Sequence, residues 1–231
     1  MYQELLIKTT FDETLRRCMI YADEAPEVIL IQLVERKEIA LLDEIVDRIH
    51  ASTNRSFVLV GVPIIDWCKE LMPWNDQAVD RRPESGKYAP QVLALLENEI
   101  LPQLYQQYGA LPVVLGGYSL GGLFALWAST RSSCFDYIAA ASPSVWISNW
   151  MTYVESHPVQ AKKVYMSLGD REEHCKNRYM KQVGDNIRSY HEQLIRQLGG
   201  DNTVLLWNKG GHFQDFAFRI ADSYSWIILH V

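Results

Sequence analysis

The sequence of 231 residues lacks the features that mark several large classes of protein. It has no long hydrophobic run: nowhere do about 18 apolar residues follow one another, the length that a membrane-spanning helix needs. Its N-terminal region is charged from the start and has no apolar run of the signal-peptide kind. Lys and Arg form no cluster, and the formal net charge is −6. We therefore expect neither a membrane nor a nucleic acid as partner.

Cysteine is scarce and widely spaced. The four cysteines have neither CxxC nor zinc-type spacing, which disfavours a structural zinc site. Without a secretory signal, they are expected to be reduced thiols in a cytoplasmic protein. His174 and Cys175 lie beside two glutamates, but no other residues stand near them at the spacing of a metal site. We therefore expect no metal, and we expect no other cofactor. The four cysteines are Cys18, Cys68, Cys134 and Cys175.

The chain shows no repeat, low-complexity tract or linker, so one domain over residues 1–231 is predicted. Apolar runs of strand length alternate with longer segments of helical periodicity. This alternation predicts an α/β fold with a mostly parallel central sheet and helices on both faces. The predicted strands are residues 5–9, 15–22, 27–34, 57–62, 112–117, 137–141, 163–168 and 203–207, and the predicted helices are 41–50, 90–108, 120–131, 149–156, 177–198 and 214–230.

The pentapeptide GYSLG, residues 117–121, matches the G-x-S-x-G pattern and lies between a predicted strand and a predicted helix. A nucleophilic serine on so tight a strand-to-helix turn leaves no room for bulky neighbours, so glycines flank it. The start of the following helix directs backbone N–H groups at charge that develops beside the serine. We predict Ser119 as a nucleophile and the N–H of Leu120 as the first oxyanion donor.

A serine hydroxyl needs a base, and a hydrolase of this type places it after the last strand. His212 follows the strand predicted at residues 203–207 and precedes the final helix, which predicts it as the base. The other histidines fit less well, because they lie in predicted helices, in other loops or at the C-terminus: His50, His157, His174, His191 and His230.

The acid that orients His212 should follow the strand predicted at residues 163–168, and three carboxylates lie there. Glu172 stands at the third position after the glycine that ends this strand, which favours it. Asp170 is shorter and nearer the strand end, and Glu173 is the third alternative. The order serine, acid, histidine holds for each of them.

Further site residues are predicted from their positions at the same sheet edge. A backbone N–H of Glu35 or Arg36, after the third strand, is expected to be the second oxyanion donor. Trp146 follows the strand after the nucleophile helix and is predicted to line a substrate pocket, with a purely structural role as the alternative. Tyr118 and Trp74 are also candidates for this pocket.

The segments GGYSLGGLFALW, ASPSVWIS, SLGDREE and GGHF, in this order, resemble the putative-esterase family of α/β-hydrolases. That family includes enterobactin-type siderophore esterases and relatives of esterase D, and the resemblance extends over most of the chain from about Phe57. It implies an α/β-hydrolase fold, Ser119 and His212 as nucleophile and base, and an acid within residues 169–173. The Asp-Gly pair that members often carry is missing from residues 34–37.

These observations predict a serine ester hydrolase that acts on a small-molecule ester through an acyl-enzyme. An acyltransferase with the same triad and a catalytically silent binding protein are the alternatives. The apolar end of the final helix, WIIL at residues 226–229, leaves room for a homodimer contact.

Overall fold

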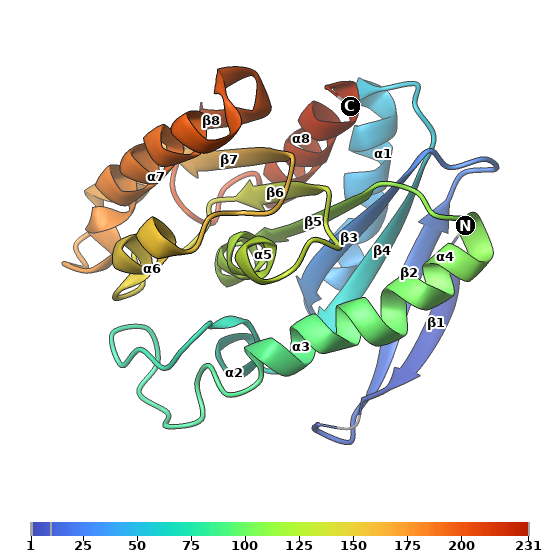
Figure 1. Ribbon diagram of the computed structural model, residues 1–231, viewed down its shortest axis with the longest axis horizontal. Coiled ribbons are helices and arrows are strands. Elements are labelled where there is room, and N and C mark those ends of the chain that lie inside the picture. The colour runs from blue at the N-terminus through green and yellow to red at the C-terminus, as the bar shows by residue number, and fades with distance from the viewer. Residues whose placement is uncertain (1, 10, 231) are drawn as a thin grey trace.

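The apolar runs of the sequence form one central sheet of eight strands in the computed structural model, which describes residues 2–9 and 11–230 (Figure 1). The strand order is β1-β2-β4-β3-β5-β6-β7-β8. The strand β2 pairs antiparallel with both of its neighbours, β1 and β4, and all other pairs in the sheet are parallel. The strands are β1 (Gln3–Lys8), β2 (Leu15–Ala22), β3 (Val28–Glu35), β4 (Phe57–Ile64), β5 (Val113–Tyr118), β6 (Tyr137–Ala141), β7 (Lys163–Gly169) and β8 (Thr203–Asn208).

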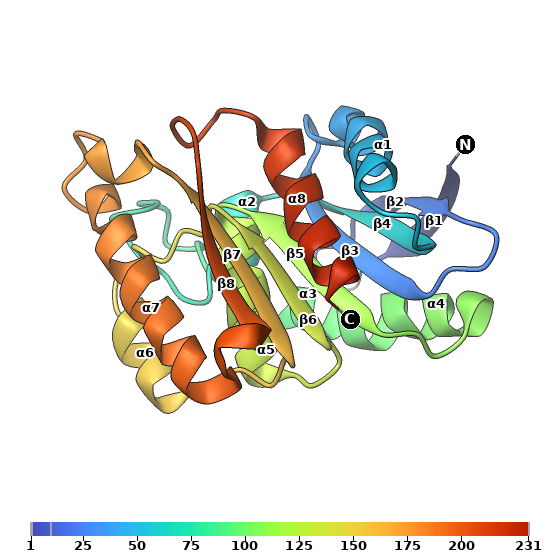
Figure 2. The ribbon, with the colours of Figure 1, turned by 90° about the horizontal axis from the view of Figure 1, so that it is seen from above.

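Helices cover both faces of this sheet, which confirms the predicted architecture (Figure 2). One face carries α1 (Leu42–Ser52) and α8 (Phe216–Leu229). The other face carries α3 (Ala89–Leu95), α4 (Leu101–Tyr108), α5 (Leu120–Arg131), α6 (Trp150–Ser156) and α7 (Val183–Leu198), and the short α2 (Trp67–Leu71) packs against α5. Single 3-10 turns lie at Ile39–Leu41, Glu172–His174, Met180–Gln182 and Gly200–Asn202.

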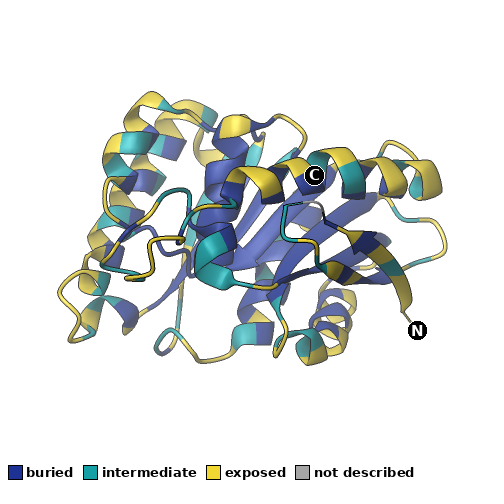
Figure 3. Cartoon of the chain, turned by 90° about the horizontal axis from the view of Figure 1, so that it is seen from below, coloured by how far each residue is buried: buried dark blue, intermediate teal, exposed yellow. Residues whose placement is uncertain are grey.

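The two-sided core explains why the central strands are almost entirely apolar. In β3, Ile29 and Ile31 face the larger core cluster, and Leu30 and Val34 face the cluster under α1 and α8. Side chains alternate between the faces of a strand, so a strand buried on both faces has no polar side. Figure 3 shows the central strands buried between helices whose outer faces are exposed.

Several helix boundaries differ from the predicted ones. The helix predicted at residues 90–108 contains a π-helical turn, Leu96–Ile100, between α3 and α4. Pro102 is the second residue after this turn, and because proline has no N–H it cannot complete the regular hydrogen-bond ladder. The helix predicted at 177–198 begins only at Val183, after a 3-10 turn. The final helix is Phe216–Leu229, shorter than predicted at both ends.

The apolar end of α8 contributes to the core of this chain. Ile227 and Ile228 are fully buried between the sheet and α1, whereas Leu229 is exposed. The helix thus offers less apolar surface for a dimer contact than its sequence suggests. No helix within residues 2–9 and 11–230 is both long and apolar enough to cross a membrane.

Candidate active site

Ser119 lies on the sharp turn between β5 and α5. Its φ is 57° and its ψ is −118°, a conformation that is costly for a residue with a side chain. The glycines make this turn feasible: a Cβ on Gly117 would lie 2.3 Å from the backbone of Gly121. The Ser119 N–H donates to the Ala141 carbonyl of β6 at 3.1 Å, which fixes the turn against the neighbouring strand. The fold thus holds the Ser119 hydroxyl at the carboxyl edge of the sheet.

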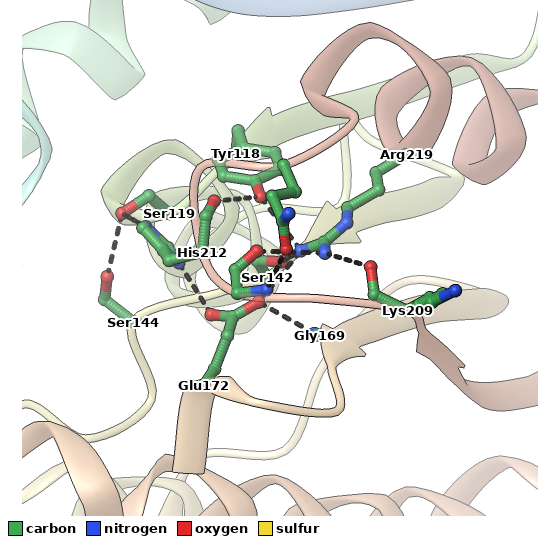
Figure 4. Close-up of polar contacts among 11 residues, drawn as sticks. Tyr118, Ser119, Ser142, Ser144, Gly169, Glu172, Lys209, His212 and Arg219 are labelled. Atoms are coloured by element: carbon green, nitrogen blue, oxygen red, sulfur yellow. Dashed lines mark hydrogen bonds and ion pairs between the residues drawn. The ribbon is translucent and has the colours of Figure 1, made fainter. Parts of the chain in front are cut away.

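Three side chains from distant parts of the sequence meet at this edge (Figure 4). The Ser119 Oγ lies 2.9 Å from Nε2 of His212. The Nδ1 of the same ring lies 2.6 Å from Oε2 of Glu172. A carboxylate accepts hydrogen bonds, so Nδ1 carries the proton, and Nε2 accepts the hydrogen of the Ser119 hydroxyl.

The Glu172 carboxylate is almost fully enclosed by hydrogen-bond donors. Its Oε1 accepts from the Gly169 N–H at 2.7 Å, the Ser142 hydroxyl at 2.8 Å and Arg219 Nη1 at 2.9 Å. Burial alone would raise the pKa of Glu172, but the hydrogen bond and charge of His212, with the bonds from Gly169 and Ser142, bring this pKa below its ordinary value. Glu172 is therefore ionised at neutral pH.

The other two acid candidates have different surroundings. Asp170 accepts the N–H of Gly210 at 2.8 Å and so ties the loop of His212 to the end of β7. Glu173 forms a bidentate ion pair with Arg188, and both hydrogen bonds are 2.8 Å long. Within the described part of the chain, neither carboxylate forms a hydrogen bond or an ion pair with His212.

Arg219 and Ser142 hold Glu172 and the loop of His212 in place, although the sequence alone predicts neither residue as part of the site. Arg219 projects from α8 and is completely buried, although its helix is otherwise mostly apolar. Besides Glu172 and Ser142, it donates to the carbonyls of Lys209 and Gly211 in the loop of His212. A lone arginine in an apolar helix is a signal for a buried ion pair, and here it connects the acid to the loop of the base.

We predict that Arg219→Met lowers the free energy of unfolding by about 3–5 kcal/mol, because it leaves the buried Glu172 carboxylate without its charged partner. Urea unfolding followed by circular dichroism measures this change. Arg48→Met is the control, since it breaks an exposed ion pair with Glu44 within one helix and should cost less than about 1 kcal/mol. Equal effects of the two substitutions would contradict the prediction.

The predicted oxyanion donors have unequal surroundings. Leu120 is the first residue of α5, and first-turn N–H groups have no acceptor within their own helix. The Glu35 N–H, in contrast, donates to the Glu38 carboxylate at 2.8 Å, and burial raises the pKa of Glu38. This amide must leave Glu38 before it can hold an oxyanion. Arg36 is exposed beside it and lines, with Glu35, a hollow of about 860 Å³ next to the β1–β2 hairpin.

A smaller pocket of about 260 Å³ adjoins His212 and Glu172. Trp146 and Phe213 line it together with Pro143, Met180 and Val183, so much of its wall is apolar. The Phe213 side chain is 91 % exposed, which is unusual for a phenyl ring and leaves its surface free for a ligand.

The other two pocket candidates lie elsewhere. Tyr118 is only 3 % exposed, its ring packs against that of His212, and its hydroxyl donates to the His212 carbonyl at 2.5 Å. Trp74 lines a separate hollow with Tyr153, and its indole N–H donates to the Ser148 carbonyl. Tyr118 therefore supports the loop and ring of the base, and Trp74 is not part of the wall beside His212. Within the described residues, no cluster of three or more His, Cys, Asp or Glu side chains could hold a metal ion.

A family model described as "Putative esterase" matches residues 37–221, four-fifths of the chain. The chain belongs to the putative esterase family. The matched range contains Ser119, Glu172 and His212. The sequence resemblance to this family is thereby confirmed.

Among curated proteins, this family member is similar to a siderophore enterobactin esterase of Emericella nidulans, with 26 % identity over 155 residues. The match includes 54 % of this chain and 50 % of the relative, so the chain matches about half the length of that protein.

Two examples represent the solved structures that share the fold. An IroE-like serine hydrolase from Shewanella oneidensis has a TM-score of 0.78 at 16 % identity, covering 98 % of this chain and 80 % of that one. The siderophore hydrolase EstA from Aspergillus nidulans has a TM-score of 0.73 at 17 % identity, covering 99 % and 94 %. These likenesses confirm the α/β-hydrolase fold.

Proposed function

We propose that this member of the putative esterase family is a serine ester hydrolase, with Ser119 as nucleophile, His212 as base and Glu172 as the acid that orients it. The observation that carries the proposal is the unbroken hydrogen-bond chain from the Ser119 hydroxyl through both ring nitrogens to a buried carboxylate. A chain of this kind activates a hydroxyl that is otherwise a poor nucleophile. The similar proteins carry names of esterases or hydrolases, which supports the same chemistry.

In the first half of the reaction, Ser119 Oγ attacks the carbonyl carbon of the ester. Its proton moves to His212 Nε2, and the carbonyl electron pair moves to oxygen, where the Leu120 N–H stabilises the charge together with a second donor at Glu35 or Arg36. Glu172 stabilises the positive imidazole ring that forms. His212 then gives its proton to the leaving alkoxide, and the acyl group remains on Ser119.

In the second half, water takes the place of the alcohol. His212 accepts a proton from water, which attacks the acyl carbon, and the C–Oγ bond breaks. The proton on Nε2 returns to Ser119 Oγ and restores the free enzyme. This cycle requires no cofactor.

The proposal is tested by hydrolysis of p-nitrophenyl acetate, an ester with an activated leaving group. Purified protein should release p-nitrophenolate with an initial burst, since the acyl-enzyme then forms faster than it hydrolyses. Prior treatment with a fluorophosphonate should abolish the release. Absence of turnover over a panel of simple esters and thioesters would favour a binding protein that does not catalyse.

We further propose that the pocket beside His212 takes the acyl part of the ester, with Trp146 as one wall. Trp146→Ala should then lower kcat/KM for p-nitrophenyl butyrate by about tenfold and change that for the acetate by less than about twofold, because only the longer chain reaches the indole. Steady-state kinetics on both esters measure this ratio. Trp74→Ala is the matched control and should leave the ratio unchanged, since Trp74 lies in another hollow. An identical shift in both variants would contradict the assignment.

A further inference from the structure

A second serine lies against the proposed nucleophile. Ser144 belongs to the loop after β6, is only 3 % exposed, and its Oγ is 3.2 Å from the Oγ of Ser119 (Figure 4). The backbone of Ser144 is held in place as well, because its N–H donates to the Ser119 carbonyl at 3.1 Å. The two hydroxyls are therefore kept together by the fold.

The direction of the bond between the two hydroxyls follows from counting hydrogens. Glu172 fixes the proton of His212 on Nδ1, so Nε2 is an acceptor. The one hydrogen of the Ser119 hydroxyl goes to Nε2 at 2.9 Å, and none remains for Ser144. The Ser144 hydroxyl must therefore be the donor and the Ser119 Oγ the acceptor.

We propose that Ser144 is a catalytic hydrogen-bond donor to the nucleophile oxygen and that it acts mainly in hydrolysis of the acyl-enzyme. The inference rests on the proposed function, since it concerns the two halves of that reaction. Ser144 contacts the reacting atom itself, which distinguishes it from Arg219 and Tyr118, which act through other residues.

The two halves of the reaction change the acceptor strength of Ser119 Oγ in opposite directions. In the acyl-enzyme, Oγ is an ester oxygen whose electrons are delocalised into the carbonyl group, so it accepts a hydrogen bond poorly. When the C–Oγ bond breaks, the electron pair returns to Oγ, and charge-assisted hydrogen bonds are the stronger ones. Ser144 therefore stabilises Ser119 as a leaving group.

Formation of the acyl-enzyme gains much less from Ser144. The free Ser119 hydroxyl already accepts the bond before attack, so the ground state and the early transition state are stabilised alike. An interaction that is equal in both states does not accelerate the step. A donor at this position therefore favours turnover of the acyl-enzyme over its accumulation.

The test compares wild type with Ser144→Ala in stopped-flow hydrolysis of p-nitrophenyl acetate. The rate constant of the burst reports acylation, and the steady-state rate reports deacylation. We expect deacylation to slow by about threefold to tenfold, the factor for loss of one hydrogen bond, and acylation to change by less than about twofold. Mass spectrometry during turnover should show a larger fraction of acylated protein. A loss of packing alone would lower both rate constants or neither.

Controls separate this inference from the proposed function. Ser129→Ala removes another buried hydroxyl, which donates only to the Leu126 carbonyl within α5, and should change neither rate constant. Ser144→Cys keeps the shape with a weaker donor and should slow deacylation in the same direction, which covers the case of an unstable alanine variant. Absence of ester hydrolysis and of fluorophosphonate labelling in wild type would overturn the proposed function. Unchanged deacylation in both Ser144 variants of an active enzyme would overturn only the role of Ser144.

Discussion

Ser119→Ala is expected to lower kcat for p-nitrophenyl acetate by a factor on the order of 10⁶ relative to wild type. The reason is that His212 and Glu172 act only through the Ser119 hydroxyl, so removal of this one oxygen leaves the rest of the hydrogen-bond chain without a nucleophile. Steady-state release of p-nitrophenolate at high protein concentration measures the residual rate.

The fold should survive this substitution. Alanine is smaller than serine and leaves the contacts of the surrounding glycines unchanged, and the backbone bond from residue 119 to Ala141 remains. Thermal unfolding followed by circular dichroism should therefore give a Tm near that of wild type. A variant that folds normally and still hydrolyses the ester at the wild-type rate would remove Ser119 from the reaction.

Glu172→Gln is expected to lower kcat by a factor on the order of 10⁴. The amide has nearly the shape of the carboxylate, but its NH₂ group can donate to Nδ1 of His212 and so favour the tautomer with the proton on Nε2. That tautomer cannot accept the hydrogen of Ser119. The buried Arg219 also loses the charge that it neutralises.

Glu173→Gln provides the matched control for this result. It changes the neighbouring residue in the same chemical way, but Glu173 contacts Arg188 and lies outside the hydrogen-bond chain. We expect its kcat to stay within about threefold of wild type, because an exposed ion pair contributes little. If Glu173→Gln and Glu172→Gln lost activity equally, the assignment of the acid would be wrong.

The pH dependence of the unfolding free energy also tests whether Glu172 is ionised in the folded protein. The pKa of this carboxyl is lowered in the folded protein from an ordinary value of 4.5, so its stabilisation is fully present above pH 4.5. This contribution is lost as the pH falls through the lowered pKa. The difference in unfolding free energy between wild type and Glu172→Gln should accordingly shrink as the pH falls below 4.5.

The sequence predicts the sheet and the nucleophile turn because their signals are local. The apolar sequences of the strands before and after α5 are enough to predict that these strands are buried. The G-x-S-x-G pattern is likewise enough to predict a turn so crowded that only glycine fits beside Ser119. The position of His212 follows similarly from the chain order of strands. These inferences require no knowledge of how side chains pack.

The surroundings of the acid are less predictable because they depend on contacts between distant segments. Asp170, Glu172 and Glu173 differ little in sequence context, and only the 3-10 turn at Glu172–His174 directs one of them toward His212. Arg219 is 47 positions from Glu172, and no local pattern relates the two. Tyr118 looks like a pocket residue because it precedes Ser119, but alternation along β5 directs it into the core beside α8, where it packs against the ring of His212.

The measurement that tests the account most directly is covalent labelling with a fluorophosphonate probe, followed by peptide mapping. The probe reacts only with a hydroxyl whose proton a base can take, so it reports the reactivity that the contact with His212 is proposed to create. The proposed triad predicts one label per chain, on Ser119, with labelling slowed strongly in Glu172→Gln. Label on another residue, or none on a folded protein, would contradict it.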